Sequence, residues 1–441
     1  MERCPLLRIG TSSCRHTSVH GRLLQLLLVL MIALLLPACV ISRQHVYLTW
    51  QGDTSQTMTV NYQTKKRLQE PAVYYDTVPR GGIPCRYAYR ATGASHQIAG
   101  LKDGRYIHTV ELSGLSPGTT YYFAAAPHDP VLANADPEVP YSCCKVRHTE
   151  EFGGGLREFK FHTIPEKDPV RFVVGGDMGI LPRAPLLLKR AAAQDPHFAV
   201  IGGDLAYANG KLRNAKMWDI WLRNWESAMV TPDGAMIPMV LAIGNHEINK
   251  DCEVPEDKAP FYFGYFAQGG RSYFSRTFGH NTVLFILDSG HITQHGGEQA
   301  AWLASELDRF RNMPNKVAVY HVPLYPSHRP FDYAGSAAGR AYWLPLFDSH
   351  GIDIAFEHHD HTYKRTKPLR NGQVDPAGTV YLGDGCMGMP ARNADNRGAW
   401  YLDDAGGIPH FWVVDLAAEG ILCRAVNVHG EVFDRYPQAA P

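Results

Sequence analysis

The sequence has no excess of charge of either sign, since 43 lysine and arginine residues balance 43 aspartate and glutamate residues in a chain of 441. No net field therefore draws the chain to nucleic acid or to an anionic membrane surface, and nucleic acid binding as such is not expected. The sequence also lacks internal repeats, low-complexity tracts and the Cys/His spacings of zinc fingers. Affinity for a charged substrate must come from a local site.

A long apolar run is present at the amino terminus, from Leu23 to Leu36 after four arginines. The run is shorter than the roughly 20 residues that a membrane-spanning helix needs. It therefore favours an export signal over residues 1–38. Cys39 ends a segment similar to a bacterial lipoprotein signal, in which this cysteine becomes lipidated, whereas ordinary cleavage after a small residue is the alternative. We expect an exported protein that is periplasmic, secreted or on the cell surface, with Cys39 as a membrane anchor if it is lipidated.

An even number of cysteines follows Cys39, in a compartment where disulfides would persist. The six are Cys85, Cys143, Cys144, Cys252, Cys386 and Cys423. Fifteen pairings of six cysteines are possible, and the sequence does not choose among them.

The length favours two domains. Residues 45–163 consist of short alternating runs separated by Gly, Pro and Asp, which predicts an all-β sandwich. Leu115 and Tyr121 bracket a Pro-Gly turn that resembles the corner of fibronectin type III domains. The segment 164–169 contains two prolines and three charges and is interpreted as a linker.

Residues 170–430 alternate buried apolar strands with helical stretches, the pattern of an α/β sandwich. The helix expected at 298–311 has Leu303, Leu307 and Phe310 on one face. Candidate strands at 171–177, 198–204, 238–245, 317–321 and 352–359 each deliver polar residues at their carboxyl ends. Ligands of α/β sheets bind at this edge, so these residues are expected to meet at one site.

The delivered side chains form a ligand set for two metal ions. Carboxylate and phenolate oxygens suit a hard trivalent ion, and imidazole and amide groups suit a divalent transition metal. The set comprises Asp177, Asp204, Tyr207, Asn245, His246, His321, His359 and His361.

Five ordered motifs resemble those of purple acid phosphatases, and larger members of that family also carry an upstream β-sandwich. The motifs are Gly176-Asp177-Met178-Gly179, Gly203-Asp204-Leu205-Ala206-Tyr207, Gly244-Asn245-His246-Glu247, the strand from Val317 to His321, and His359-Asp360-His361. The resemblance implies a metallophosphoesterase domain that hydrolyses phosphate monoesters at a Fe(III)-M(II) centre, with metal-bound hydroxide as the nucleophile.

The resemblance also implies a role for each residue. Asp177, Tyr207 and His361 would bind Fe(III). Asn245, His321 and His359 would bind a divalent ion (Fe, Zn or Mn), and Asp204 would bridge the two ions. His246 would contact the phosphoryl oxygen or the leaving group. His328 would be a second catalytic residue that contacts substrate, with a solvated loop histidine as the alternative.

Two departures from the family pattern affect the surroundings of the ligands. His358 stands where the family usually has Gly, and Lys364 where it commonly shows Glu. An alternative register would make His358 a ligand. For Tyr207, the alternative is a buried tyrosine that packs behind the metals.

Competing functions are a phosphodiesterase or nucleotide hydrolase on the same scaffold, and a surface binding protein with a degenerate hydrolase domain. Degeneracy should erode ligands, and all seven residues to which the resemblance assigns metal binding are present. Trp218, Trp221, Trp225 and Met229 recur at helical spacing and are expected to pack in a core. His291 and His295 lie in a glycine-rich segment that is interpreted as a surface loop, with a position in the cleft as the alternative.

Overall fold

The computed structural model describes residues 45–129, 156–167, 169–383, 385–417 and 420–437. The predicted signal over residues 1–38, Cys39, Cys143 and Cys144 lie outside these ranges. Among the helices of the described ranges, none has the length and apolar character to cross a membrane.

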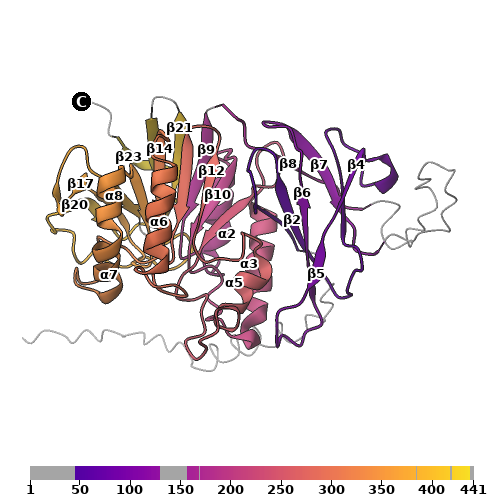
Figure 1. Ribbon diagram of the computed structural model, residues 1–441, viewed down its shortest axis with the longest axis horizontal. Coiled ribbons are helices and arrows are strands. Elements are labelled where there is room, and N and C mark those ends of the chain that lie inside the picture. Colours follow the sequence, from indigo (N-terminus) through magenta and orange to yellow (C-terminus); the bar gives the residue numbers. More distant parts are fainter. Residues whose placement is uncertain (1–44, 130–155, 168, 384, 418–419, 438–441) are drawn as a thin grey trace, which may run out of the picture. The chain divides into compact units, whose positions relative to one another are not determined.

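The first part of the chain folds into two antiparallel sheets of four strands each (Figure 1). One sheet contains β1 (Val46–Thr49), β2 (Met58–Thr64), β6 (Tyr106–Leu112) and β5 (Ala94–His96) in spatial order, and the other β4 (Tyr89–Thr92), β3 (Ala72–Asp76), β7 (Thr120–Ala125) and β8 (Phe159–His162). Val60 of β2 and Phe123 of β7 face each other's sheets and are buried in a shared core. At the predicted corner, Leu115 is buried and the Ser116 amide donates to the Tyr121 hydroxyl at 2.9 Å. The predicted all-β domain of fibronectin type III character is confirmed.

Two further sheets build the second part. The six-stranded sheet has the order β11 (Met239–Ala242), β10 (Phe198–Gly202), β9 (Val170–Gly175), β21 (His410–Ala417), β22 (Gly420–Asn427) and β23 (Val432–Tyr436). The seven-stranded sheet has the order β12 (Phe274–Phe278), β13 (Thr282–Ile286), β14 (Asn315–Val319), β15 (Ile354–Glu357), β19 (Val380–Gly383), β16 (Tyr363–Thr366) and β20 (Leu402–Gly406). β23 lies past residue 430, where the sequence placed the end of this domain.

Strand periodicity assigns each face of these sheets to a different core. In β9, Phe172 and Val174 point into a core shared by both sheets, while Val173 packs on the opposite side. That outer side is covered by α2 (Arg183–Ala192), α3 (Ala215–Ala228) and α5 (Pro260–Tyr265). The short helix α4 (Pro255–Lys258) precedes α5 and buries none of its residues. The outer side of the other sheet is covered by α6 (Glu298–Arg309), α7 (Ala334–Tyr342) and α8 (Leu344–His350) (Figure 1). The result is the predicted α/β sandwich.

The tryptophans of α3 belong to the core, as predicted. Trp218, Trp221 and Trp225 are each exposed by 1% or less, and Met229 is equally buried. Trp221 and Trp225 stack with ring centroids 5.5 Å apart. Their helical spacing therefore reflects packing and not an aromatic binding stripe.

Parallel pairing determines where the motifs meet. β9, β10 and β11 are parallel neighbours, and so are β13, β14, β15 and β19. Parallel strands end at the same edge, so the segments that follow them lie together at one edge of each sheet. Two short strands, β17 (Leu369–Arg370) and β18 (Gln373–Val374), pair on their own.

Candidate metal centre

Every predicted ligand lies in the segment that follows a strand of one of the two large sheets. Asp177 follows β9, Asp204 follows β10 and Asn245 follows β11. His321 follows β14, and His359 and His361 follow β15. The paired strands thus fix the start of each ligand-bearing segment. The short turns that follow orient the ligand side chains.

The turns place ligands in an unusual backbone conformation. Among the described residues, Asp177, Asp204, Tyr207, His359 and His361 have φ angles of 52°, 52°, 60°, 75° and 58°. Such left-handed conformations cost non-glycine residues roughly 1–3 kcal/mol each and cluster at functional sites. The surrounding structure therefore holds these side chains in place against a local preference for other conformations.

Three donor atoms converge in what we call the tyrosine group, which consists of Asp177, Tyr207 and His361. The Tyr207 hydroxyl donates to Asp177 Oδ1 at 3.0 Å and lies 3.1 Å from His361 Nε2. His361 Nε2 lies 2.9 Å from the same carboxylate oxygen. The other oxygen of Asp177 accepts the His359 amide at 2.9 Å, which joins this group to the next.

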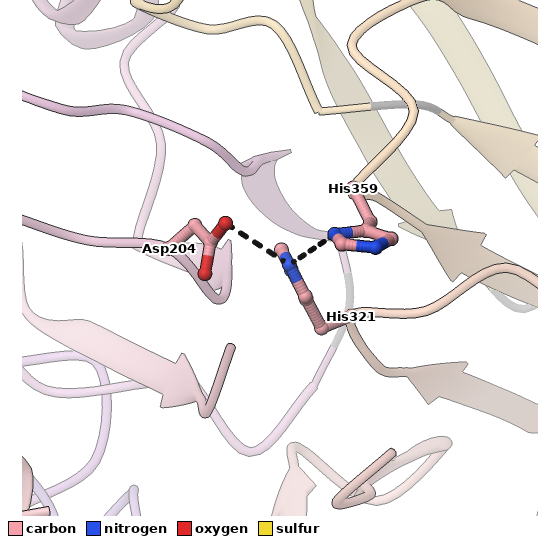
Figure 2. A group of neighbouring side chains, drawn as sticks. All are labelled: Asp204, His321 and His359. Carbon is pink, nitrogen blue, oxygen red and sulfur yellow. Dashed lines mark hydrogen bonds and ion pairs between the residues drawn. The ribbon is translucent and has the colours of Figure 1, made fainter. Parts of the chain in front are cut away.

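The histidine group consists of Asp204, Asn245, His321 and His359. His321 Nε2 is its centre, 3.2 Å from Asp204 Oδ2, 3.3 Å from Asn245 Oδ1 and 3.1 Å from His359 Nδ1. Figure 2 shows His321 between Asp204 and His359, and these three side chains are buried. Their ligand atoms lie within 4.8 Å of one another, as the donors of a metal site must.

The chemistry of the donors fits cations in both groups. His321 Nδ1 lies 2.9 Å from the Gly202 carbonyl and His361 Nδ1 lies 3.3 Å from the Pro390 carbonyl. Because a carbonyl only accepts, each Nδ1 carries a proton, so each Nε2 can present a lone pair to a cation. Carboxylate, amide and imidazole donors would then all face that cation at close range.

The electrostatics of the tyrosine group also favour a bound cation. Burial and the Asp177 carboxylate raise the pKa of the Tyr207 phenol well above its ordinary value. Burial alone would raise the pKa of Asp177 too, but His361 and His321 lower it below its usual range. A phenolate at position 207 therefore requires a cation to replace its proton.

Glycines at these strand ends make room for the ligands themselves. A Cβ at Gly244 would lie 2.3 Å from Asp204 Oδ1, and a Cβ at Gly385 would lie 1.8 Å from Asp177 Oδ2. Any larger residue would displace a carboxylate of the site.

His246 lies close to one residue of each group. Its ring stacks on Tyr207 with centroids 4.1 Å apart, and Nε2 lies 3.8 Å from Asp204 Oδ2. Nδ1 lies 2.5 Å from Asn209 Oδ1, an acceptor, so Nδ1 carries the proton. The side chain is one-third exposed, at 33%, and can meet a substrate from solvent.

His328 is placed differently. Its Nδ1 lies 3.0 Å from the Asn393 carbonyl and 2.9 Å from Asp395 Oδ2. Its backbone amide donates to Asp360 Oδ2 at 2.9 Å, so the residue is tied to the last motif through its main chain. A contact of its ring with substrate stays a prediction.

The two departures from the family pattern have structural partners. His358 is buried with Nδ1 2.9 Å from the Tyr320 carbonyl, and its ring occupies the space that a Cβ at Gly176 or Gly202 would need. The ring packs between the two strand ends that precede Asp177 and Asp204, so the geometry gives no support to the alternative register. Lys364 forms a fully buried ion pair with Glu357.

Several buried polar residues of the site were missed or misjudged in the sequence. Glu247 accepts the amides of Asp204, Leu205 and Gly244 at 2.8, 2.8 and 2.9 Å, and so joins two motifs. His291 and His295, interpreted as surface loop residues, are only 8% and 4% exposed, and that interpretation is wrong. Asp288 accepts the amides of residues 291, 292 and 293, which folds the glycine-rich loop inward. An Asp three residues before His291 was the available signal.

Comparison with known proteins agrees with this architecture. Residues 43–131 match the purple acid phosphatase N-terminal domain, and residues 170–363 match the calcineurin-like phosphoesterase family. Purple acid phosphatase 15 of Arabidopsis thaliana is 26% identical over 69% of this chain and 57% of its own length. Purple acid phosphatase 22 of the same plant is 27% identical over 78% of this chain and 71% of its own length. The chain thus spans less than two thirds of the length of the first of these relatives.

A solved structure shares the fold. Purple acid phosphatase PPD1 from yellow lupin (Lupinus luteus) seeds superposes with a TM-score of 0.67 at 19% identity, covering 89% of this chain and 73% of that chain. An α/β sandwich with metal donors at its strand ends, preceded by a β-sandwich, defines a metal-dependent phosphoester hydrolase. Within that class, the two domains of this chain are similar to those of purple acid phosphatases.

Proposed function

We propose that the tyrosine group binds Fe(III), that the histidine group binds a divalent ion (Fe, Zn or Mn), and that Asp204 bridges them. The observation that carries this proposal is the Tyr207 hydroxyl between Asp177 Oδ1 and His361 Nε2, at 3.0 and 3.1 Å. Carboxylate and phenolate oxygens favour a hard trivalent ion, whereas the amide and two imidazoles of the other group favour a divalent one. The substrate class that we infer is phosphate monoesters.

When bound, two such ions would supply Lewis acidity toward phosphoryl oxygens and lower the pKa of water. The chain's own residues would position the substrate and supply a proton to its leaving group. His246 Nδ1 is held by Asn209, which leaves Nε2 facing solvent beside Asp204. Protonated at Nε2, His246 would donate a hydrogen bond to the phosphoryl oxygen or a proton to the leaving alkoxide. Burial lowers the pKa of His246 below its ordinary value, and the charge of Asp204 offsets part of that shift in favour of the protonated form.

The colour of the protein tests the assignment. A phenolate bound to Fe(III) gives a broad visible charge-transfer band, so iron-loaded protein should be purple or pink. We expect Tyr207→Phe to lose the band while metal analysis still finds iron. Tyr47→Phe is the matched control, because that buried tyrosine donates to the Tyr265 carbonyl at 2.8 Å, in another part of the molecule. A colourless wild type with ferric iron bound, or a coloured Tyr207→Phe, would refute the proposal.

A phosphodiesterase or nucleotide hydrolase on this scaffold is the alternative, since the metal donors act on phosphorus and do not read the rest of the substrate. An assay of matched monoesters and diesters decides between them. Faster hydrolysis of the diesters would replace monoesters as the substrate class.

We further propose a chain divided into an export signal (1–38), a fibronectin type III-like domain (45–163) and a catalytic domain that starts at residue 170. The signal and the lipidation of Cys39 rest on the sequence pattern of the amino terminus. In a bacterial host, Cys39→Ser should release the protein from membranes, and unchanged fractionation would rule out the lipid anchor.

A further inference from the structure

Three large aromatic side chains are exposed on segments next to the histidine group. Phe331 and Tyr333 lie in the loop after His321 and are 41% and 37% exposed, and Trp400, before β20, is 46% exposed. Phe331 and Trp400 both contact Tyr401, and Tyr333 lies two residues from Phe331, which places the three in one region of the surface. Contiguous exposed apolar patches mark binding surfaces on soluble proteins.

Tyr333 lies directly beside a predicted metal ligand. Its ring centroid is 6.1 Å from that of His359, with 36° between the planes. The Arg329 guanidinium lies 5.6 Å from the Tyr333 ring and donates from Nη1 to the His359 carbonyl at 2.9 Å. Arg329 therefore connects the ring to the motif that supplies His359, which limits the ring's freedom.

Phe331 and Trp400 rest on a shared buried support. Tyr401, 2% exposed, lies 5.4 Å from Phe331 and 5.5 Å from Trp400 between ring centroids. The Arg340 guanidinium covers Phe331 at 3.7 Å, and Arg340 also donates to the Phe331 carbonyl. Rings held in this way lose little conformational entropy when a flat ligand stacks on them.

We propose that Tyr333, Phe331 and Trp400 form an aromatic shelf that stacks the flat part of the substrate's leaving group, the base of a nucleoside or an aryl ring, while the phosphoryl group lies at the metal donors. This inference rests on the proposed phosphoesterase function and adds a substrate class to it. Aromatic faces accept any planar ring, and Arg329, paired with Asp360, holds the Tyr333 ring beside the motif that supplies His359. An aliphatic ester has nothing to stack there.

Substitution of Tyr333 tests the shelf with three monoesters: adenosine 5′-phosphate, phenyl phosphate and glycerol phosphate. Stacking contributes roughly 1–3 kcal/mol per base, so Tyr333→Leu should lower kcat/KM for a stacked substrate by about 5- to 150-fold, mainly through KM. Glycerol phosphate should be hydrolysed as before, and Tyr333→Phe should retain the wild-type preference. Tyr89→Leu is the matched control, since Tyr89 is 52% exposed on β4 of the other domain.

A larger loss with adenosine 5′-phosphate identifies a nucleobase as the occupant, and a larger loss with phenyl phosphate identifies an aryl ring. An equal loss for all three esters, or no loss for any, would overturn the shelf. Binding separates this failure from failure of the proposed function. If no ester is hydrolysed the proposed function falls, and calorimetric titration with phenylphosphonate against methylphosphonate still decides the shelf, because only the first should lose affinity in Tyr333→Leu.

Discussion

Arg329 and Asp360 form an ion pair beside the predicted ligands, with Arg329 Nη1 2.5 Å from Asp360 Oδ1 and the aspartate fully buried. Asp360 separates His359 from His361 in sequence, and its Oδ2 accepts the amides of Ser327 and His328 at 2.9 Å each. One carboxylate thus fastens the loop after His321 to the segment that supplies two histidines. Residues that orient metal ligands in this way contribute to metal affinity without touching the ion.

Asp360→Asn should therefore weaken metal binding. The amide keeps the size of the side chain but leaves Arg329 without its counter-charge, and we expect metal affinity to fall about 10- to 100-fold. Competition with a chelator measures it. Asp395→Asn is the control, because that carboxylate is 57% exposed and bound to His328. Equal affinities in wild type and Asp360→Asn would show that the orientation of His359 and His361 does not depend on this residue.

Asn209 should position His246. Its φ of 55° is accessible to glycine, so Asn209→Gly removes the amide without adding backbone strain. We expect Asn209→Gly to lower kcat about tenfold with unchanged metal content, and His246→Ala to lower it by about 10²- to 10⁴-fold. Asn209→Asp, which retains an acceptor for Nδ1, should keep most activity.

A double mutant distinguishes positioning from an independent role. If Asn209 acts through the imidazole, Asn209→Gly should cost nothing further in the His246→Ala background. Additive losses would contradict this role, and loss of both metals in His246→Ala would show that His246 serves the ions and not the substrate.

The sequence predicted the strand ends and the residues that they deliver, because apolar runs that end in Asp177, Asp204 or His321 are local patterns. It did not predict the left-handed backbone at Tyr207 and His359, since such conformations are imposed by contacts between distant segments. The burial of His291 was missed for a related reason: a loop rich in glycine has the composition of a surface loop, and only the amides gathered by Asp288 turn it inward. The aromatic shelf combines positions some 70 residues apart, which no spacing rule joins.

His295 should make stability depend on pH. Burial lowers the pKa of this ring from its ordinary value near 6.5 to about 4. Between these values the unfolded chain binds a proton that the folded chain does not, so this residue's contribution falls as the pH drops from 6.5 toward 4 and is constant above 6.5. At pH 5 the loss from this one group is about 2 kcal/mol.

Urea unfolding at pH 7.5 and pH 5.0 measures this loss. His295→Leu retains an apolar contact with Trp343, whose ring lies 4.7 Å away, and has no proton to bind. The drop in unfolding free energy between the two pH values should be about 2 kcal/mol smaller in this variant than in wild type. The same drop in both proteins would mean that His295 titrates normally in the folded chain.

Glu357 and Lys364 are expected to stabilise the fold only as a pair. Both side chains are 0% exposed, and Glu357 Oε1 also accepts the Tyr320 hydroxyl at 2.7 Å and the Leu324 amide at 2.6 Å. Lys364→Met would leave a buried carboxylate without its cation, at a cost of about 3–5 kcal/mol in unfolding free energy. Glu357→Gln combined with Lys364→Met should recover most of that loss, because no charge remains buried.

Arg397→Met is the control, since Arg397 and Asp404 form a pair at 3.3 Å with side chains 72% and 46% exposed. Its cost in unfolding free energy should stay below about 1 kcal/mol. Equal costs for Lys364→Met and Arg397→Met in denaturant unfolding would mean that the buried lysine does not hold Glu357 in place.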